Sequence, residues 1–348
     1  MTMKLPLSRS VGGMAAALLA MVASMPSLAQ PIAITGATLA IGDGSEPVRG
    51  GTVVIDAGKV VAAGAGIAVP AGAKVIDAAG KWVTPGLVSG FSRVGLAEVP
   101  AVTETNDISA NSPFSAAIDV APAINPLANP IAISRTGGVT RAVVAPAAAS
   151  GIFGGQGAVI DLGADMSPIT KARAFEYVEM GEAGAAEAGG SRAAMILTFR
   201  MMLRQAQDYA KAPTSFDGNS KDALLNRVDA EALVPVVTGA IPLMVHVESA
   251  RDILTVLSLR QDFPALRLIL AGATEGWMVA PQIAAATEGF SSTDRDRAWG
   301  IQFALAARHP DAPILIDGIV GALEDREAAF VQFAAQSRVE EGRLVRAA

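Results

Sequence analysis

The chain has 348 residues, of which 51% are apolar, and its formal net charge is -6 at pH 7. This length and apolar content are enough for one large α/β domain with an appendage or for two modest domains. The acidic balance excludes the broad basic surface that a nucleic-acid-binding protein needs, and the absence of cysteine excludes disulfides and a thiol nucleophile.

Residues 1–29 have the features of a secretory signal peptide. Lys4 and Arg9 give a positively charged start, residues 11–25 form an apolar run, and Ser27-Leu28-Ala29 offers small residues for cleavage. The run is too short to span a membrane comfortably. We therefore predict export to a bacterial periplasm with no membrane span after cleavage. An uncleaved anchor or a buried helix is the alternative.

Residues 30–84 are predicted to form a small β domain. Loosely alternating or apolar stretches are separated by turn-forming residues such as Gly42-Asp43-Gly44 and Asp56-Ala57-Gly58. The pattern predicts strands at 32–39, 52–55, 59–63 and 74–76.

From residue 85 to residue 348, predicted strands and helices alternate, which is typical of a parallel sheet or barrel. Strands are expected at 87–91, 139–145, 242–247, 266–271 and 312–316. Helices are expected at 170–211, 253–259, 276–286 and 326–338. The segment 106–130, rich in Asn, Ser, Pro and Ala, is predicted to be a long loop or lid.

The glycines of 151–157, GIFGGQG, predict a tight turn or a close backbone approach. A phosphate-binding loop is the weaker alternative, because the Lys-Ser/Thr of a P-loop and the spacing of a dinucleotide-binding fingerprint are both missing.

Three segments resemble the amidohydrolase superfamily. VTPGLVSGFSRVG at 83–95 resembles the start of that family's barrel, where PGL is followed shortly by His-x-His, but Phe91 and Arg93 stand at the two histidine positions. PLMVHVESARDI at 242–253 resembles the strand that brings a metal-binding histidine to the barrel mouth, with His246 in the matching position. LRLILAGATEGW resembles the following strand, with Gly272 at the usual histidine position.

The segment 137–163 resembles periplasmic imidazolonepropionase-like members of the family, in which a strand leads to a Gly-Gln-Gly loop. The resemblance implies an incomplete TIM-like (β/α) barrel with a small N-terminal β-sandwich half, and a hydrolase of non-peptide C–N bonds. It weakens beyond residue 286, and no recognisable last barrel strand follows, so we expect an incomplete barrel. Either the barrel is C-terminally truncated, or a partner completes it, or the fold is altered.

The family uses zinc or another divalent metal, which needs several imidazole and carboxylate ligands around an open position. This chain has two histidines. His309 lies in a polar connection that is typical of the surface. His246 alone cannot hold zinc, and Arg93 would place a fixed positive charge where the metal ion should sit. We therefore predict that the metal site is lost and that no cofactor is bound.

Four polar residues follow or end predicted strands and are expected near the barrel mouth. His246 and Glu275 are the predicted catalytic residues, and Arg93 and Glu248 are predicted to bind a small-molecule or carboxylate-bearing ligand, since a guanidinium matches a carboxylate in two parallel hydrogen bonds. Each has a structural alternative. Arg93 could pair with Glu98 or Glu248, and His246 could bond a backbone carbonyl. The two glutamates could stabilise the N-termini of the helices that follow them.

Three functions remain open at this point. The first is a binding or accessory protein that has lost the metal centre of its hydrolase ancestors. The second is an active amidohydrolase or dipeptidase with an unconventional site, and the third is a truncated non-functional fragment. The sequence leaves the substrate undetermined and a homo-oligomer open.

Overall fold

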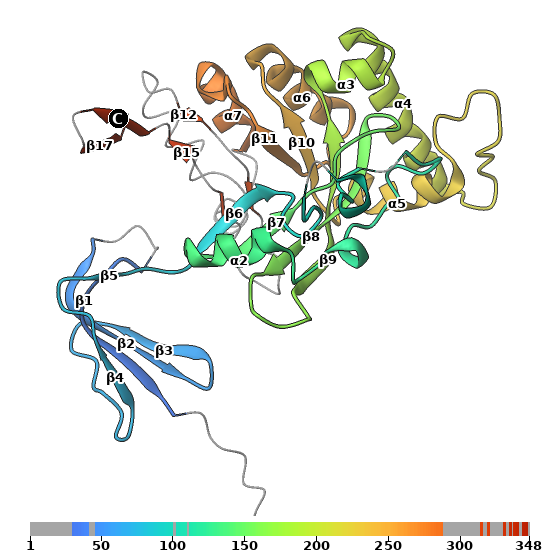
Figure 1. Ribbon diagram of the computed structural model, residues 1–348. Helices are drawn as coiled ribbons and strands as arrows, with labels where there is room; N and C mark the ends of the chain where they lie inside the picture. Colours follow the sequence, from blue (N-terminus) through green and yellow to red (C-terminus); the bar gives the residue numbers. More distant parts are fainter. Residues whose placement is uncertain are drawn as a thin grey trace, which may run out of the picture. The chain divides into compact units, whose positions relative to one another are not determined.

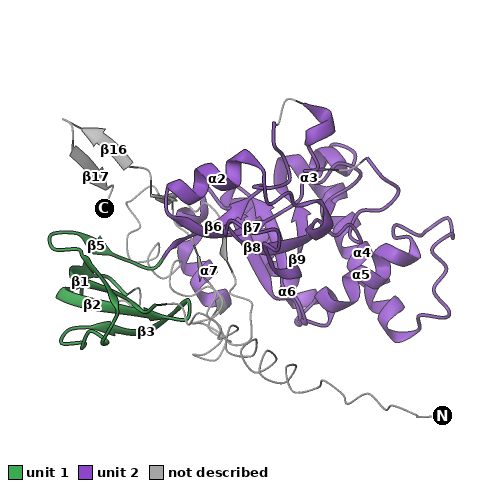
Figure 2. Cartoon of the chain, turned by 60° about the horizontal axis from the view of Figure 1, so that its bottom comes forward, with its two compact units in different colours: residues 1–85 green, residues 86–348 purple. Residues whose placement is uncertain are grey.

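The computed structural model describes residues 30–41, 46–99, 102–109 and 111–287, and the backbone of short strands between residues 314 and 346. The chain divides into two compact units, Met1–Pro85 and Gly86–Ala348 (Figure 2). The predicted signal peptide and His309 lie outside the described residues. None of the described helices has both the length and the apolar character needed to cross a bilayer.

Unit 1 is a five-stranded sheet built around β1 (Ile32–Leu39). β2 (Val48–Asp56) pairs antiparallel with β1 and with β3 (Lys59–Gly64), whereas β4 (Lys74–Asp77) and β5 (Trp82–Val83) pair parallel with β1 (Figure 1). The β2–β3 turn has positive φ at both central residues, 48° at Ala57 and 78° at Gly58, which suits a tight two-residue hairpin. All four strands predicted in this region are present.

Unit 2 contains a six-stranded, nearly closed, barrel-like sheet with the order β11-β10-β9-β8-β7-β6. Its strands are β6 (Leu87–Ser92), β7 (Val139–Val144), β8 (Phe153–Asp161), β9 (Ile169–Glu179), β10 (Leu243–Val247) and β11 (Leu268–Gly272). β6 is parallel to β7, and β9, β10 and β11 are parallel to one another. β8 runs antiparallel to both neighbours. The sheet is therefore mixed, which is consistent with an incomplete barrel but differs from the uniformly parallel sheet of a TIM barrel.

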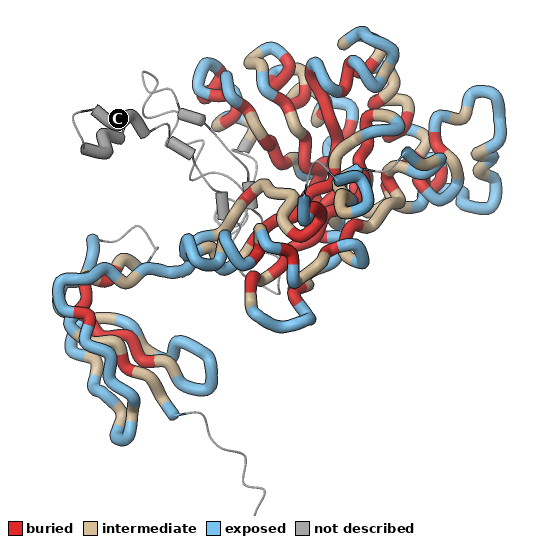
Figure 3. The backbone as a smooth tube through the Cα atoms, viewed as in Figure 1, coloured by how far each residue is buried: buried red, intermediate tan, exposed pale blue. Residues whose placement is uncertain are grey.

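Helices and apolar strand residues share one large core (Figure 3). It joins β8–β11 to α4 (Arg192–Lys211), α5 (Arg227–Val237) and α6 (Ala250–Asp262), each of which begins after a side-chain cap, namely Ser191, Asn226 and Ser249 respectively. The remaining helical segments are η1 (Thr103–Thr105), η2 (Ala121–Ala123), α2 (Asn129–Thr136), α3 (Gly181–Glu187), η3 (Gly276–Val279) and α7 (Ala280–Thr287).

The helix predicted at 170–211 is wrong over its first ten residues, which belong to β9. Residues 174–179 are all buried, because β9 lies between β8 and β10 and its hydrogen bonds go to both. Tertiary pairing overrides the weak helix preference of this segment. The prediction is right for α4, which contains the strongest part of the helical pattern.

The turn or Gly-Gln-Gly loop predicted within 151–157 is also wrong, because Gly155, Gln156 and Gly157 lie inside β8. The alternative of a close backbone approach is correct. A Cβ at Gly157 would overlap the ring of Phe175 on β9, and Gly155 with φ 114° faces the backbone of Ile118. These glycines let neighbouring segments approach β8 closely.

Other predictions differ in detail. Most of 106–130 is irregular, as expected, although η2 lies within it and α2 begins at Asn129. The helix α5 was not predicted. The expected strand at 312–316 contains β12 (Ile314–Leu315). The helix expected at 326–338 is contradicted where the structure describes that range, by β14 (Phe330–Val331), β15 (Ala334–Ala335) and β16 (Ser337–Glu340), and the other residues of the range lie outside the description. β13 (Ile319–Val320) and β17 (Arg343–Arg346) complete the set.

Candidate functional site

Polar and aromatic side chains gather where parallel strands of unit 2 end. Glu179 is the last residue of β9, and His246 lies directly beside it on β10. Glu248 follows β10, and Arg93 follows β6. We call this group the strand-end site, and it comprises Phe91, Arg93, Tyr177, Glu179, His246, Glu248 and Thr274.

His246 is held between two carboxylates. Its Nδ1 lies 2.8 Å from Oε2 of Glu179, and its Nε2 lies 3.2 Å from Oε1 of Glu248. The His246 side chain is 25% exposed, Glu179 is 10% exposed and Glu248 is 51% exposed. The imidazole therefore connects an interior carboxylate to one at the surface.

Both ring nitrogens face acceptors, so the arrangement favours the protonated imidazolium, in which both nitrogens donate. Burial by itself lowers the pKa of His246, but hydrogen bonds and charge from Glu179 and Glu248 outweigh it and raise the pKa to about 9. At neutral pH His246 is a cation.

Glu248 is the complementary anion. Partial burial tends to raise its pKa, but the hydrogen bonds from His246 and from the side chain and backbone of Thr274, with the His246 charge, lower it to about 2. The Thr274 N–H lies 3.1 Å from Glu248 Oε2, and the Thr274 hydroxyl donates to the same oxygen. Glu248 thus accepts hydrogen bonds from both β10 and the loop after β11.

Three aromatic rings stack at the site. The Phe91 ring centroid lies 5.6 Å from that of His246 and 6.0 Å from that of Tyr177, with interplanar angles of 15° and 16°. The Tyr177 hydroxyl donates to Glu179 Oε1 at 2.5 Å. Burial, followed by the charge and hydrogen bond of Glu179, raises the pKa of Tyr177, and Arg93 opposes this effect. The phenol therefore stays protonated and acts as a donor.

Arg93 lies beside this stack. Its Cζ is 5.9 Å from the centre of the Phe91 ring, and it is close enough to Tyr177 to form a side-chain hydrogen bond. Its Nε is buried and has no hydrogen-bond partner among the described residues. The ion pairs with Glu98 or Glu248 that were the structural alternative are absent from the described contacts, where Glu98 instead accepts from Asn125 and Glu248 binds His246.

Glu275 lies next to Glu248, since its backbone N–H donates to the Glu248 carbonyl at 3.0 Å, but its carboxylate does not reach His246. Its carboxylate accepts from the backbone N–H of Ala250 at 2.8 Å, at the first residue of α6, so its side chain faces that helix rather than His246. The structural alternative was that each glutamate stabilises the N-terminus of the helix that follows it, and neither carboxylate does so. Glu275 stabilises the N-terminus of α6, which follows Glu248 in the chain, whereas Glu248 binds His246. The structure brings Arg93, His246 and Glu248 together and leaves Glu275 at their edge.

Sequence reasoning missed Tyr177 and Glu179. Phe175, Tyr177 and Glu179 occupy every second position of β9 and so share one face of the strand. Glu179 could have been predicted, because it is a carboxylate at the end of an apolar strand, directly before Met180-Gly181. It was missed because the segment was predicted to be helical.

The residues at the strand-end site do not fit a zinc centre. No group of three or more His, Cys, Asp or Glu side chains in the described parts of the chain is placed to hold a metal ion. A metal-binding imidazole must offer a lone pair, whereas a carboxylate oxygen lies within 3.2 Å of each ring nitrogen of His246. The Phe91 ring, stacked on His246, offers no ligand atom.

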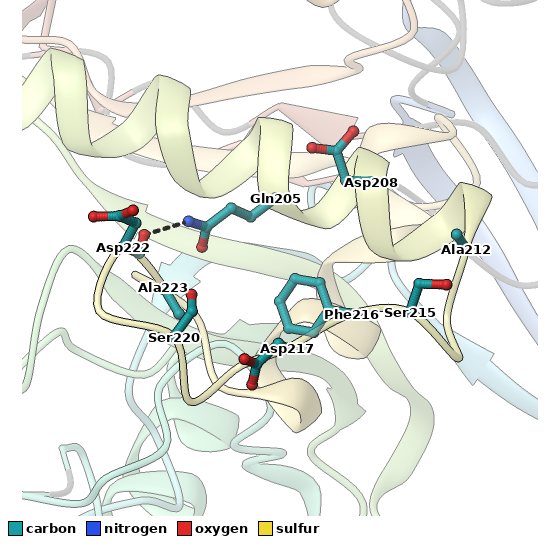
Figure 4. A pocket seen from close by; sticks show the side chains of 9 residues that line it. All are labelled: Gln205, Asp208, Ala212, Ser215, Phe216, Asp217, Ser220, Asp222 and Ala223. Atoms are coloured by element: carbon teal, nitrogen blue, oxygen red, sulfur yellow. Dashed lines mark hydrogen bonds between the residues drawn. The ribbon is translucent and has the colours of Figure 1, made fainter.

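A pocket of about 340 Å³ lies elsewhere in unit 2, between the second half of α4 and the segment that follows it (Figure 4). Gln205 of α4 donates to the backbone oxygen of Asp222 at 2.8 Å and accepts from the backbone of Leu224 and Leu225. The pocket is lined by Gln205, Asp208, Ala212, Ser215, Phe216, Asp217, Ser220, Asp222 and Ala223. It shares no residue with the strand-end site.

Comparison with known proteins gives matches in structure alone, since no protein-family model and no curated protein matches the chain. An amidohydrolase from Thermotoga maritima MSB8 is similar, with a TM-score of 0.63 and 25% identity over 73% of this chain and 67% of that one. This likeness supports the amidohydrolase superfamily.

Two further matches have low TM-scores. N-acetyl-D-glucosamine-6-phosphate deacetylase from Mycobacterium smegmatis has a TM-score of 0.29 and 14% identity, over 75% of this chain and 54% of that one. A prolidase has a TM-score of 0.34 and 12% identity, over 81% and 73%. The likeness to the Thermotoga maritima protein supports the predicted resemblance at the level of the superfamily.

Proposed function

We propose that the chain is an exported, imidazolonepropionase-like protein of the amidohydrolase superfamily that has lost the metal centre and binds a small carboxylate-bearing molecule. Its ancestors would be hydrolases of amide or cyclic amide bonds. One observation carries the proposal: Glu179 and Glu248 occupy both ring nitrogens of His246. The positive charge of the site then comes from a proton on His246 and from Arg93 instead of a metal ion.

Arg93 is the group proposed to bind the ligand. A guanidinium keeps its charge at any working pH and presents donors in a planar fork that matches a carboxylate. His246 already has two carboxylate partners, whereas no described carboxylate pairs with Arg93 and its buried Nε lacks an acceptor. The guanidinium charge of Arg93 therefore has no carboxylate partner among the described residues, and an anionic ligand would supply one.

The test is isothermal titration calorimetry with N-acetylglycine, which carries an amide and a carboxylate, and with N-acetylglycinamide, which lacks the charge. We expect N-acetylglycine to bind more tightly, and Arg93→Ala to weaken it about tenfold to a hundredfold, the usual worth of a charge-assisted hydrogen bond. Arg200→Ala is the matched control, because Arg200 is a partly exposed arginine on α4 that pairs with Asp262. Equal binding by wild type and Arg93→Ala would remove the proposed role of Arg93.

An active amidohydrolase or dipeptidase with an unconventional site is the second candidate. An imidazolium between two carboxylates can donate a proton to a departing amine, which is the observation in its favour. Against it, the low pKa of Glu248 makes that carboxylate a weak base for activating water. Acetate released from N-acetylglycine, followed by proton NMR and abolished in His246→Asn, would favour this candidate over a binding protein.

Two further measurements test the rest of the proposal. Stoichiometric zinc in the purified protein that is lost in His246→Asn would overturn the loss of the metal centre. Cell fractionation tests export: the proposal expects the protein in the periplasmic fraction, shortened by about 29 residues as the signal-peptide pattern predicts. Retention of the full-length chain in the cytoplasm would refute it.

A further inference from the structure

Gly272 lies directly beneath the Glu248 carboxylate. It is the last residue of β11, its φ is 75°, and a Cβ built on it would lie 2.8 Å from Cδ of Glu248 and closer still to Oε1. Such a separation is shorter than any normal contact between these atoms, so one of the two groups would have to move.

The flexible carboxylate would move, because the surrounding backbone cannot. Gly272 is flanked by Ala271 and Ala273, both 0% exposed, and it pairs with Val247, which is 1% exposed. The Ala273 N–H also donates to the Val247 carbonyl at 2.6 Å. The Glu248 side chain, in contrast, is 51% exposed and can rotate into solvent.

Moving the carboxylate would break the contacts that complete the strand-end site. Glu248 reaches His246 with Oε1 and Thr274 with Oε2, and a side chain at position 272 would lie against both oxygens. His246 would then keep Glu179 as its one carboxylate partner and expose Nε2.

We propose that a side chain at position 272 and the Glu248–His246 ion pair are mutually exclusive, so that glycine at this position is the positioning residue that lets Glu248 close on His246. The missing side chain at Gly272 on β11 and the position of the Glu248 carboxylate after β10 therefore depend on each other. The inference concerns the site of the proposed function but does not depend on any ligand, and its test uses the ligand-free protein.

The first test measures His246 directly by NMR titration of the imidazole signals. The chain has two histidines, and His309→Gln identifies the other signal. We expect Gly272→Ala to lower the pKa of His246 from about 9 to below about 8, because one of its two carboxylate partners is displaced. Gly138→Ala is the matched control, since Gly138 also has positive φ, 88°, but has no atom within 4 Å of an added Cβ. It should leave the pKa of His246 unchanged.

A second test applies even if Gly272→Ala is too unstable for NMR. Backbone strain at φ 75° affects any alanine at position 272, whereas the overlap exists only when Glu248 is present. We therefore expect Gly272→Ala to lower the melting temperature more in the wild-type background than in Glu248→Ala. An unchanged pKa of His246 in Gly272→Ala, or equal losses of melting temperature in the two backgrounds, would overturn the proposal. Failure of N-acetylglycine to bind would leave it standing and would count against the proposed function alone.

Discussion

The ion-paired imidazolium of His246 should make the stability of unit 2 depend on pH in the alkaline range. The pKa of His246 rises from 6.5, its ordinary value, to about 9 in the folded chain. A folded-state pKa above the unfolded value means that the stabilisation is fully present below pH 6.5 and is lost as the pH rises through 9. At about 1.4 kcal/mol for each tenfold change in proton affinity, this corresponds to about 3 kcal/mol. Glu248 belongs to the same ion pair, so its lowered pKa adds no separate contribution in this range.

The measurement is urea unfolding at about pH 6 and about pH 10, followed by far-ultraviolet circular dichroism, because all of the described helices belong to unit 2. His246→Gln is the reference, since glutamine cannot titrate while tyrosines and lysines respond in both proteins. Wild type should lose about 3 kcal/mol more than the variant between these pH values. If wild type and His246→Gln lose the same free energy of unfolding, His246 is not held as an imidazolium.

The remaining predictions concern residues that support the site and the core. Asp229→Ala should cost about 2–3 kcal/mol in urea unfolding, because this buried carboxylate accepts from the backbone N–H groups of Ser115 and Ala117; a loss below about 0.5 kcal/mol would contradict these contacts. Gly157→Ala should cost about 1–3 kcal/mol through overlap with the buried ring across the strand pair, and an unchanged melting temperature would show that β8 and β9 are not packed as described. Glu275→Ala should cost less than about 1 kcal/mol, the usual range for a charge at a helix N-terminus, and should leave the NMR-measured pKa of His246 unchanged; a lowered pKa would show that the Glu275 carboxylate interacts with His246.

The sequence predicted those parts of the fold whose signals are local. The alternating strands of unit 1, the turn at Asp56-Ala57-Gly58 and the capped helix after Ser249 all depend on residues that are neighbours in the chain. The position of His246 near a strand end followed from the apolar run that precedes it. Arg93 was placed near the site for the same reason.

Local sequence signals did not predict which segments pair as strands. β8 and β9 were missed because glycines in one and helix-favouring residues in the other hide strands that are stabilised by burial between neighbours. With β9 predicted as a helix, Tyr177 and Glu179 could not be assigned to the site.

By itself, the sequence determined that the chain has two histidines and that Phe91, Arg93 and Gly272 stand at positions where the resemblance leads us to expect histidine. Only the tertiary structure decided which groups surround His246, because Glu179 and His246 are 67 residues apart and meet through the parallel register of β9 and β10. Likewise, a glycine in a sequence says nothing about which atom fills the space above it. That atom is a carboxylate oxygen of Glu248, and its position depends on two strands ending side by side.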